Sequence, residues 1–228
     1  MTPDVIGILR GTDLLASVSA EDLRTVAAAS RLRRFGRGQI VFTRNDPSDT
    51  VVVVVSGRVK MVFRSADGGE LTLAVLGPGA VFGEIGVVDN GPRSADAETL
   101  EECQLLLVPR EAVQDICARV PAAAQVLSRS IAAILRRLTE VTADLVFLDL
   151  PRRVAKVLLS APRGDDGVIR QKMSQEEFAH QVGGTRQSVN AALRGFERRG
   201  WIELRGRSVT VKQAVALGRF AGTEVSGS

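Results

Sequence analysis

Residues 185–191 read Thr-Arg-Gln-Ser-Val-Asn-Ala, and Leu193, Phe196 and the turn Gly200-Trp201-Ile202 follow them. This pattern is typical of the second helix of a helix-turn-helix that runs into a β-hairpin wing. We expect the wing to span Trp201–Val211, with the turn Arg205-Gly206-Arg207-Ser208 between its two strands.

The segment just before this stretch predicts the first helix of the motif. Ser174 can cap the helix N-terminus, and Glu177, three residues on, can complete a capping box. Phe178 and Val182 supply apolar positions, and the pair Gly183-Gly184 supplies the turn. The sequence therefore predicts a helix-turn-helix over residues 174–199.

A helix-turn-helix places its second helix in the major groove of DNA. We expect Arg186 and Gln187 to meet base edges, and Ser188 and Asn190 to lie near bases or phosphates. The full predicted DNA-binding set is Thr185, Arg186, Gln187, Ser188, Asn190, Arg194 and Arg207.

The distribution of charge agrees with an anionic partner for this region. Residues 149–228 hold 14 Lys and Arg against 8 Asp and Glu, a net of +6, whereas residues 1–148 hold 16 against 18, a net of −2. A basic cluster attracts the phosphate backbone regardless of sequence, although a solvated surface can also be basic.

Composition argues against several other classes of protein. The sequence starts Met-Thr-Pro-Asp without a leader pattern, and its longest aliphatic run is the five valines 51–55, so we expect a cytoplasmic chain without a membrane partner. Cys103 and Cys117 are the only cysteines and His180 is the only histidine. We therefore expect no metal, heme or iron-sulfur cluster.

Residues 32–110 carry a different pattern from the rest of the chain. Short β-branched runs alternate with Gly, Pro, Asn and Asp turns, which is typical of a small antiparallel barrel or roll. The expected strands are 39–43, 51–55, 59–63, 71–76 and 105–108. The fold class is therefore predicted as α+β, with an N-terminal antiparallel β-roll, a long helix and a C-terminal winged helix-turn-helix.

Helical periodicity returns from Val113 to Leu148, with one break at Pro121. Seven apolar residues there alternate at spacings of four and three, which predicts a coiled-coil seam against the same helix of a second subunit. A helix buried on its own domain is the alternative. The predicted dimer-interface residues are Leu127, Ile131, Ile134, Leu138, Val141, Leu145 and Leu148.

A second polar constellation lies inside the predicted roll. Gly83 and Glu84 precede a short helix, and Arg93, Ser94 and Ala95 follow it. Arg93 offers a planar fork of donors for a phosphate, Ser94 adds a hydroxyl, and Glu84 can accept hydrogen bonds from sugar hydroxyls. These residues predict a site for a phosphate next to a ribose. The alternative is that Arg93 forms an ion pair with Glu84 or Glu98.

The chain is expected to have, in order, a β-roll that contains residues 83–95, a long helix and a winged helix-turn-helix. In this order it resembles the family of the cyclic AMP receptor protein and the fumarate-nitrate regulator (the CRP/FNR family). The resemblance covers about Leu14 to Lys212. Its motifs are Phe35-Gly36-Arg37-Gly38, Ser56-Gly57-Arg58-Val59-Lys60, Phe82-Gly83-Glu84, Pro92-Arg93-Ser94-Ala95, Phe147-Leu148-Asp149 and Thr185-Arg186-Gln187-Ser188-Val189.

The resemblance implies a homodimer that binds a palindromic DNA site under the control of a cyclic nucleotide. Glu84 would take the ribose 2′-hydroxyl, and Arg93 with Ser94 would take the cyclic phosphate. The expected effector is cyclic AMP, with cyclic GMP as an alternative, and RNA polymerase is a candidate partner. The implied regions are the roll at 1–118, the dimerisation helix and hinge at 119–149 and the DNA-binding domain at 150–228.

The chain departs from the family pattern in two places. Cyclic AMP receptors contact the adenine with two adjacent polar residues on the long helix, and this chain has Leu138 and Thr139 there. Leu138 cannot hydrogen-bond a base, so base selection is open. In the recognition helix Gln187 stands where relatives commonly have Glu, so we expect a half-site related to TGTGA but distinct from it.

Two other functions were compared with this one. A regulator of the same family that ignores cyclic nucleotides is the closer alternative, but the retained Glu84, Arg93 and Ser94 argue against it. An enzyme controlled by a cyclic nucleotide is more remote, because the chain has no Walker loop and no tyrosine, and its single histidine lies in the helix-turn-helix.

Overall fold

The computed structural model describes residues 4–66, 68–161, 164, 170–172, 174–206 and 208–222, with only the backbone at 170–172. The chain forms two compact units, one of Met1–Ser65 with Leu73–Leu138 and one of Ala66–Thr72 with Thr139–Ser228. The long helix is thus shared between the units. Its first turns, as far as Leu127, are packed into the core of the first unit.

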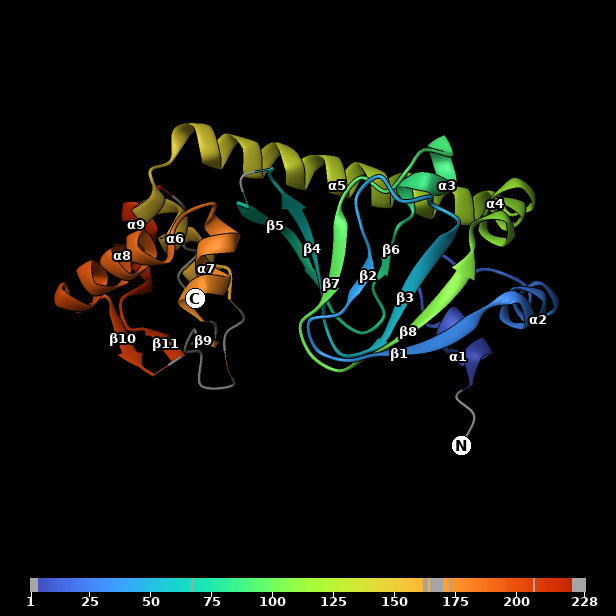
Figure 1. Cartoon of the computed structure of the whole chain (residues 1–228), viewed down its shortest axis with the longest axis horizontal. Coiled ribbons are helices and arrows are strands. Elements are labelled where there is room, and N and C mark those ends of the chain that lie inside the picture. Colours follow the sequence, from blue (N-terminus) through green and yellow to red (C-terminus); the bar gives the residue numbers. More distant parts are fainter. Residues whose placement is uncertain are drawn as a thin grey trace. The chain divides into compact units, whose positions relative to one another are not determined.

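The first unit is a β-roll with helices at both of its chain ends (Figure 1). Its helices are α1 (Val5–Arg10), α2 (Ala20–Ala29), α3 (Ile85–Asp89), α4 (Arg110–Arg119) and the first part of α5 (Pro121–Phe147). Its strands are β1 (Arg31–Phe35), β2 (Ile40–Phe42), β3 (Thr50–Ser56), β4 (Val59–Arg64), β5 (Glu70–Leu76, shared with the second unit), β6 (Val81–Phe82), β7 (Asp96–Thr99) and β8 (Cys103–Pro109). In the described residues they form two four-stranded sheets, β1-β8-β3-β6 and β2-β7-β4-β5.

Strand β3 explains why five valines occur in succession. Val51 and Val53 pack with the N-terminal helices, α4 and the start of α5. Val52 and Val54 point the other way, into a second core that contains Phe82. Side chains alternate along a strand, so a strand covered on both faces needs apolar residues at every position.

The two sheets include strands that the apolar pattern did not predict. Strand β7 carries Asp96 and Glu98, and it lies antiparallel to β4 with Lys60 opposite Glu98. Lys60 Nζ lies 3.5 Å from Glu98 Oε2, and Arg64 Nη1 lies 2.8 Å from Asp96 Oδ2. Cross-strand ion pairs therefore stabilise a strand whose composition looks like that of a loop.

The C-terminal part of the second unit has the predicted winged helix-turn-helix. Its elements are α6 (Leu150–Leu159), β9 (Arg170–Lys172), α7 (Gln175–Val182), α8 (Arg186–Arg198), β10 (Ile202–Arg205), β11 (Ser208–Val211) and α9 (Ala214–Ala221). The strands pair in the order β10-β11-β9. Phe196 lies at the centre of an aromatic cluster, with ring centroids 5.9 Å from Trp201 and 5.5 Å from Phe220.

The hinge before this domain follows from local chemistry. The Asp149 side chain accepts a hydrogen bond from the Arg152 backbone N–H at 2.9 Å, and Pro151 lies in the first turn of α6. Proline is tolerated there because the first turn has no internal partners for its N–H groups. A new helix, α6, therefore begins at Leu150.

The predicted seam along α5 needs one correction. Leu127 is 6% exposed and belongs to the core of its own unit, so it is not available to a partner helix. Leu148 lies one residue beyond the end of α5. Leu138 and Leu145 are exposed on the helix, as are Leu135, Val146 and Phe147. The uncovered apolar surface of α5 therefore begins beyond Leu127.

Candidate functional site

Arg93 is the centre of the predicted phosphate site, and the structure buries it to 4% exposure. Its backbone is held by the loop before β3: Arg93 N donates to Asp46 O, and Asn45 N donates to Arg93 O, both at 2.9 Å. Its guanidinium donates from Nη2 to Thr50 Oγ1 at 2.9 Å and from Nη1 to Gly83 O at 3.3 Å. These contacts fix the direction of the side chain.

The guanidinium of Arg93 has neutral hydrogen-bond partners in the described residues. Its Nε is buried without any partner, and its face lies 4.0 Å from the ring centre of Phe42. Burial lowers the pKa of Arg93, while the nearby carboxylates of Asp49 and Asp46 raise it. A buried cation without a directly paired anion is costly, so the arrangement is suited to receive an anion from outside.

The alternative ion pairs of Arg93 are not formed. Glu98 instead pairs with Lys60 and Arg64 of β4. Glu84 accepts a hydrogen bond from Ser130. Within the described residues, the prediction of a surface ion pair for Arg93 is therefore wrong.

Two positions near this site, 83 and 86, have no room for a side chain. Gly83 has a φ of +81°, and a Cβ built there would overlap Arg93 Nη1. A Cβ on Gly86 would overlap the Ser48 side chain. Glycine is needed at both positions because the backbone approaches other groups too closely for a side chain.

Glu84 lies next to Gly83 in the chain, but its carboxyl group contacts α5. It is 6% exposed, and its Oε1 accepts a hydrogen bond from Ser130 Oγ at 2.8 Å. Burial raises the pKa of Glu84 above its ordinary value of 4.5, and hydrogen bonds from its own backbone N–H and from Ser130 oppose that rise. Glu84 and Ser130 also line a cavity of about 560 Å³.

The other predicted ligand residues differ in how far they are buried. Ala95 is buried, whereas Ser94 is exposed. Leu138 and Thr139 are exposed on α5. The structure thus brings Gly83 and Arg93 into contact, and Glu84 lies beside them without touching the guanidinium.

Sequence reasoning missed three residues that complete this site. Phe42, Thr50 and Ser130 contact predicted residues that lie 43 to 51 positions away in the chain. Such contacts depend on how the strands pair, and a local motif does not contain that information. A threonine at the start of a valine-rich strand is by itself ordinary.

The helix-turn-helix is built by local capping. Ser174 Oγ accepts from Glu177 N at 3.1 Å, and Ser174 N donates to Glu177 Oε2 at 2.6 Å, so the predicted capping box is formed. Gly183 ends α7 with a φ of +62°. Thr185 then caps α8 by accepting from Ser188 N at 3.2 Å. These caps set where the recognition helix α8 begins.

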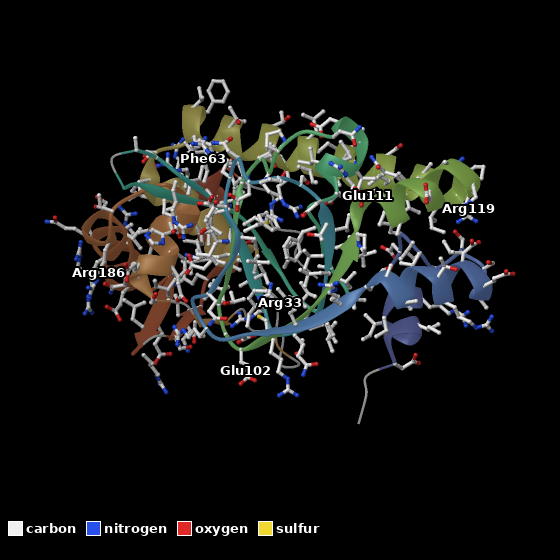
Figure 2. All side chains as sticks on the ribbon, turned by 45° about the vertical axis from the view of Figure 1, so that its right-hand side comes forward. Arg33, Phe63, Glu102, Glu111, Arg119 and Arg186 are labelled. Carbon is white, nitrogen blue, oxygen red and sulfur yellow. The ribbon has the colours of Figure 1, made fainter. Side chains whose placement is uncertain are left out.

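The N-terminal turn of α8 presents its side chains to solvent. Thr185, Arg186, Gln187 and Ser188 are exposed, and Arg186 is labelled on this helix in Figure 2. In the described part of the chain, the side chains of Arg186 and Gln187 have no hydrogen-bond partner. The opposite face buries Val189, Leu193 and Phe196. The helix is therefore held by its apolar face while its polar face is free to meet a ligand.

The remaining predicted DNA-binding residues have internal partners or lie outside the described residues. Asn190 Oδ1 accepts from Gln175 Nε2 at 3.3 Å. Arg194 is exposed and lies 2.9 Å from Glu197 Oε2, an exposed pair that is easily exchanged for a phosphate. Arg207 of the wing lies outside the described residues.

Comparisons with known proteins agree with both halves of this description. A cyclic nucleotide-binding domain model matches residues 32–120, and a Crp-like helix-turn-helix domain model matches residues 152–220. A CRP-like cAMP-activated global transcriptional regulator of Mycobacterium tuberculosis is 39% identical over 193 residues, which cover 82% of this chain and 86% of that protein. The chain belongs to the CRP/FNR family.

One further relative supports this assignment, and one solved structure has the same fold. The cyclic AMP receptor protein of Thermus thermophilus is 31% identical over 93% of this chain and 98% of its own length. The solved structure of the c-di-GMP responsive global regulator of Xanthomonas campestris has a TM-score of 0.74 at 24% identity, and covers 85% of this chain and 99% of that one. The chain is thus a transcription regulator of this family, with a cyclic nucleotide-binding roll and a DNA-binding helix-turn-helix.

Other groups that could carry chemistry are few in the described residues. No cluster of three or more His, Cys, Asp and Glu could hold a metal ion there. Cys103 is buried and Cys117 is partly buried, and burial raises the pKa of both thiols. No described helix is long and apolar enough to span a membrane.

We expect Glu84→Gln to stabilise the ligand-free regulator at neutral pH. The folded-state pKa of Glu84 is raised, so its ionisation costs stability as the pH rises above 4.5. The amide removes that cost, so the melting temperature of the variant should exceed that of the wild type at pH 7, and the difference should shrink toward pH 4. Thermal unfolding across this pH range measures it.

Glu101→Gln is the matched control for that experiment. Glu101 has a side chain that is 44% exposed, and the hydrogen bonds from Arg58 lower its pKa, so its charge favours the folded state above its ordinary pKa. This variant should be slightly less stable than the wild type at pH 7. A Glu84→Gln effect that does not vary with pH would contradict the role of burial.

Proposed function

We propose that this chain is a homodimeric regulator whose affinity for a palindromic DNA site is controlled by a cyclic nucleotide bound in the roll, with cyclic AMP as the effector. The observation that carries the proposal is Arg93, a buried guanidinium with neutral partners and an unpartnered Nε. Such a group is suited to a cyclic phosphate. The Mycobacterium tuberculosis relative is cAMP-activated, which supports this choice of effector.

The homodimer is supported by the surface of α5. Five large apolar side chains of this helix are exposed, and Phe147 has the largest exposed fraction, at 78%. Exposed apolar surface of this extent on one helix favours a partner helix. The partner proposed is the same helix of a second copy, which would place two recognition helices on two half-sites.

The proposed action is regulatory and takes place in the cytoplasm, where the DNA lies. The exposed polar turn at Arg186 and Gln187 is the part proposed to read base edges, with Thr185, Ser188, Asn190 and Arg194 near it. The half-site is proposed to differ from TGTGA because Gln187 favours adenine where a glutamate would favour cytosine. RNA polymerase is proposed as a further partner.

A second candidate stays within the family. Leu138 gives the base no hydrogen bond, and the Xanthomonas campestris protein of this fold is c-di-GMP responsive, so a different effector, or none, is the alternative. This alternative keeps the DNA-binding role and changes only the signal.

Calorimetric titration of the purified protein with cyclic AMP and with cyclic GMP tests the proposal. We expect micromolar or tighter binding of cyclic AMP, together with a rise in DNA affinity on a site selected from random sequence. If neither nucleotide gives heat or raises the melting temperature, cyclic nucleotide control is refuted and the second candidate is favoured.

A further inference from the structure

The carboxyl group of Glu84 is held by the hydroxyl of Ser130. Ser130 lies on α5, 46 residues further along the chain, and donates from Oγ to Oε1 at 2.8 Å. Glu84 is buried and Ser130 is half-buried. Hydrogen bonds to a charged acceptor in such surroundings are among the stronger ones.

The surroundings of this bond leave space for a different arrangement. Glu84 and Ser130 line the cavity of about 560 Å³ together with the aliphatic residues Leu14, Val81 and Val126. Most buried side chains are confined to one rotamer by close packing. Glu84 therefore borders unfilled space on its cavity side, which the charged residues Asp13 and Arg129 also line.

An ionised carboxylate only accepts hydrogen bonds, and the hydroxyls of serine and of ribose are the same kind of donor. A sugar hydroxyl that approaches Glu84 therefore competes with Ser130 for the same acceptor. The binding free energy of that hydroxyl is the difference between the two hydrogen bonds.

We propose that Ser130 holds Glu84 in the ligand-free protein and that the ribose 2′-hydroxyl of the nucleotide replaces it. Ser130 is then a positioning residue that weakens the preference of the site for a ribonucleotide over a 2′-deoxyribonucleotide. The exchange also releases a contact between the roll and α5. This inference rests on the proposed function, because it needs a cyclic nucleotide with its sugar near Glu84.

Titration of the full-length wild type and of Ser130→Ala with cyclic AMP and with 2′-deoxy cyclic AMP tests it. Alanine removes the competing donor, so cyclic AMP should bind about two- to tenfold more tightly to the variant. The 2′-deoxy compound cannot displace Ser130, so its affinity should stay the same. The ratio of the two affinities should therefore rise about two- to tenfold.

Two further variants separate this role from a structural one. Ser130→Thr keeps the hydroxyl and should restore the wild-type ratio. Ser128→Ala removes an exposed serine of the same helix, whose Oγ donates to Ala124 O at 2.9 Å, and should leave the ratio unchanged.

The outcomes distinguish the two proposals. If the wild type binds cyclic AMP and Ser130→Ala has an unchanged or lower ratio, this inference is refuted while the proposed function stands. If the wild type binds neither compound, the proposed function fails and this inference fails with it.

Discussion

Arg93→Ala is expected to weaken cyclic nucleotide binding by about 2–5 kcal/mol, which is roughly 30- to 4,000-fold in Kd. The guanidinium is buried and aimed by Thr50 and Gly83, so its loss leaves the cyclic phosphate without its charged partner. Calorimetric titration measures the affinity. The ligand-induced rise in DNA affinity should disappear with it, while weak DNA binding that depends on salt remains.

The controls for Arg93 separate charge, geometry and folding. Arg93→Lys keeps a positive charge but loses the planar fork, so its affinity should lie between those of the wild type and Arg93→Ala. Arg34→Ala removes an exposed arginine from β1 and should bind the nucleotide like the wild type. If Arg93→Ala melts cooperatively and binds the nucleotide as tightly as the wild type, the phosphate site lies elsewhere.

Arg186→Ala is expected to cost about 1–3 kcal/mol at each half-site, and thus about 2–6 kcal/mol for a dimer on a palindrome. Arg186 is exposed at the start of α8, where side chains of a helix-turn-helix reach base edges. The loss should be confined to the selected site and should relax the preference at one base pair. Fluorescence anisotropy with the selected site and its single-base variants measures both effects.

Arg198→Ala is the matched control, because it removes the same charge from the exposed C-terminal end of α8. A phosphate contact there would weaken binding to all sequences alike and make the salt dependence less steep. If Arg186→Ala also weakens all sequences equally, Arg186 contacts the backbone and does not read a base.

Most apolar strands of the roll were predictable, although the two-residue strand β6 was missed, whereas the charged strands were not. Strand β3 was expected because its valines are β-branched and continuous. Strands β1 and β7 were missed because Arg31–Phe35 and Asp96–Thr99 are rich in charge. Their place in the sheets is set by pairing with β8 and β4, which no local pattern contains.

In the C-terminal domain, too, the elements with local sequence signals were predicted, and an element stabilised by packing was missed. The capping box at Ser174 and the helices of the motif were correct, because caps act over three residues. Helix α9 was missed, since it is only eight residues long and contains Gly218, which has weak helix propensity. Its Leu217 is fully buried, so packing against the domain core stabilises it.

The local motifs of the candidate site were predicted, whereas the features that depend on tertiary packing were not. Gly83 and Arg93 lie only ten positions apart in the sequence, and the structure brings them into contact. The predicted seam on α5 wrongly included Leu127, because a periodic pattern cannot tell whether Leu127 faces a partner or its own roll.

The contact between Gly83 and Arg93 also restricts the order in which this sequence can change over generations. A side chain at position 83 would overlap the guanidinium, so a mutation there is harmful while Arg93 is present. Once Arg93 is lost, that overlap disappears, and residues that tolerate positive φ, such as asparagine, become acceptable. In a lineage that loses the phosphate site, Arg93 is therefore expected to mutate before Gly83, and the opposite order is disfavoured.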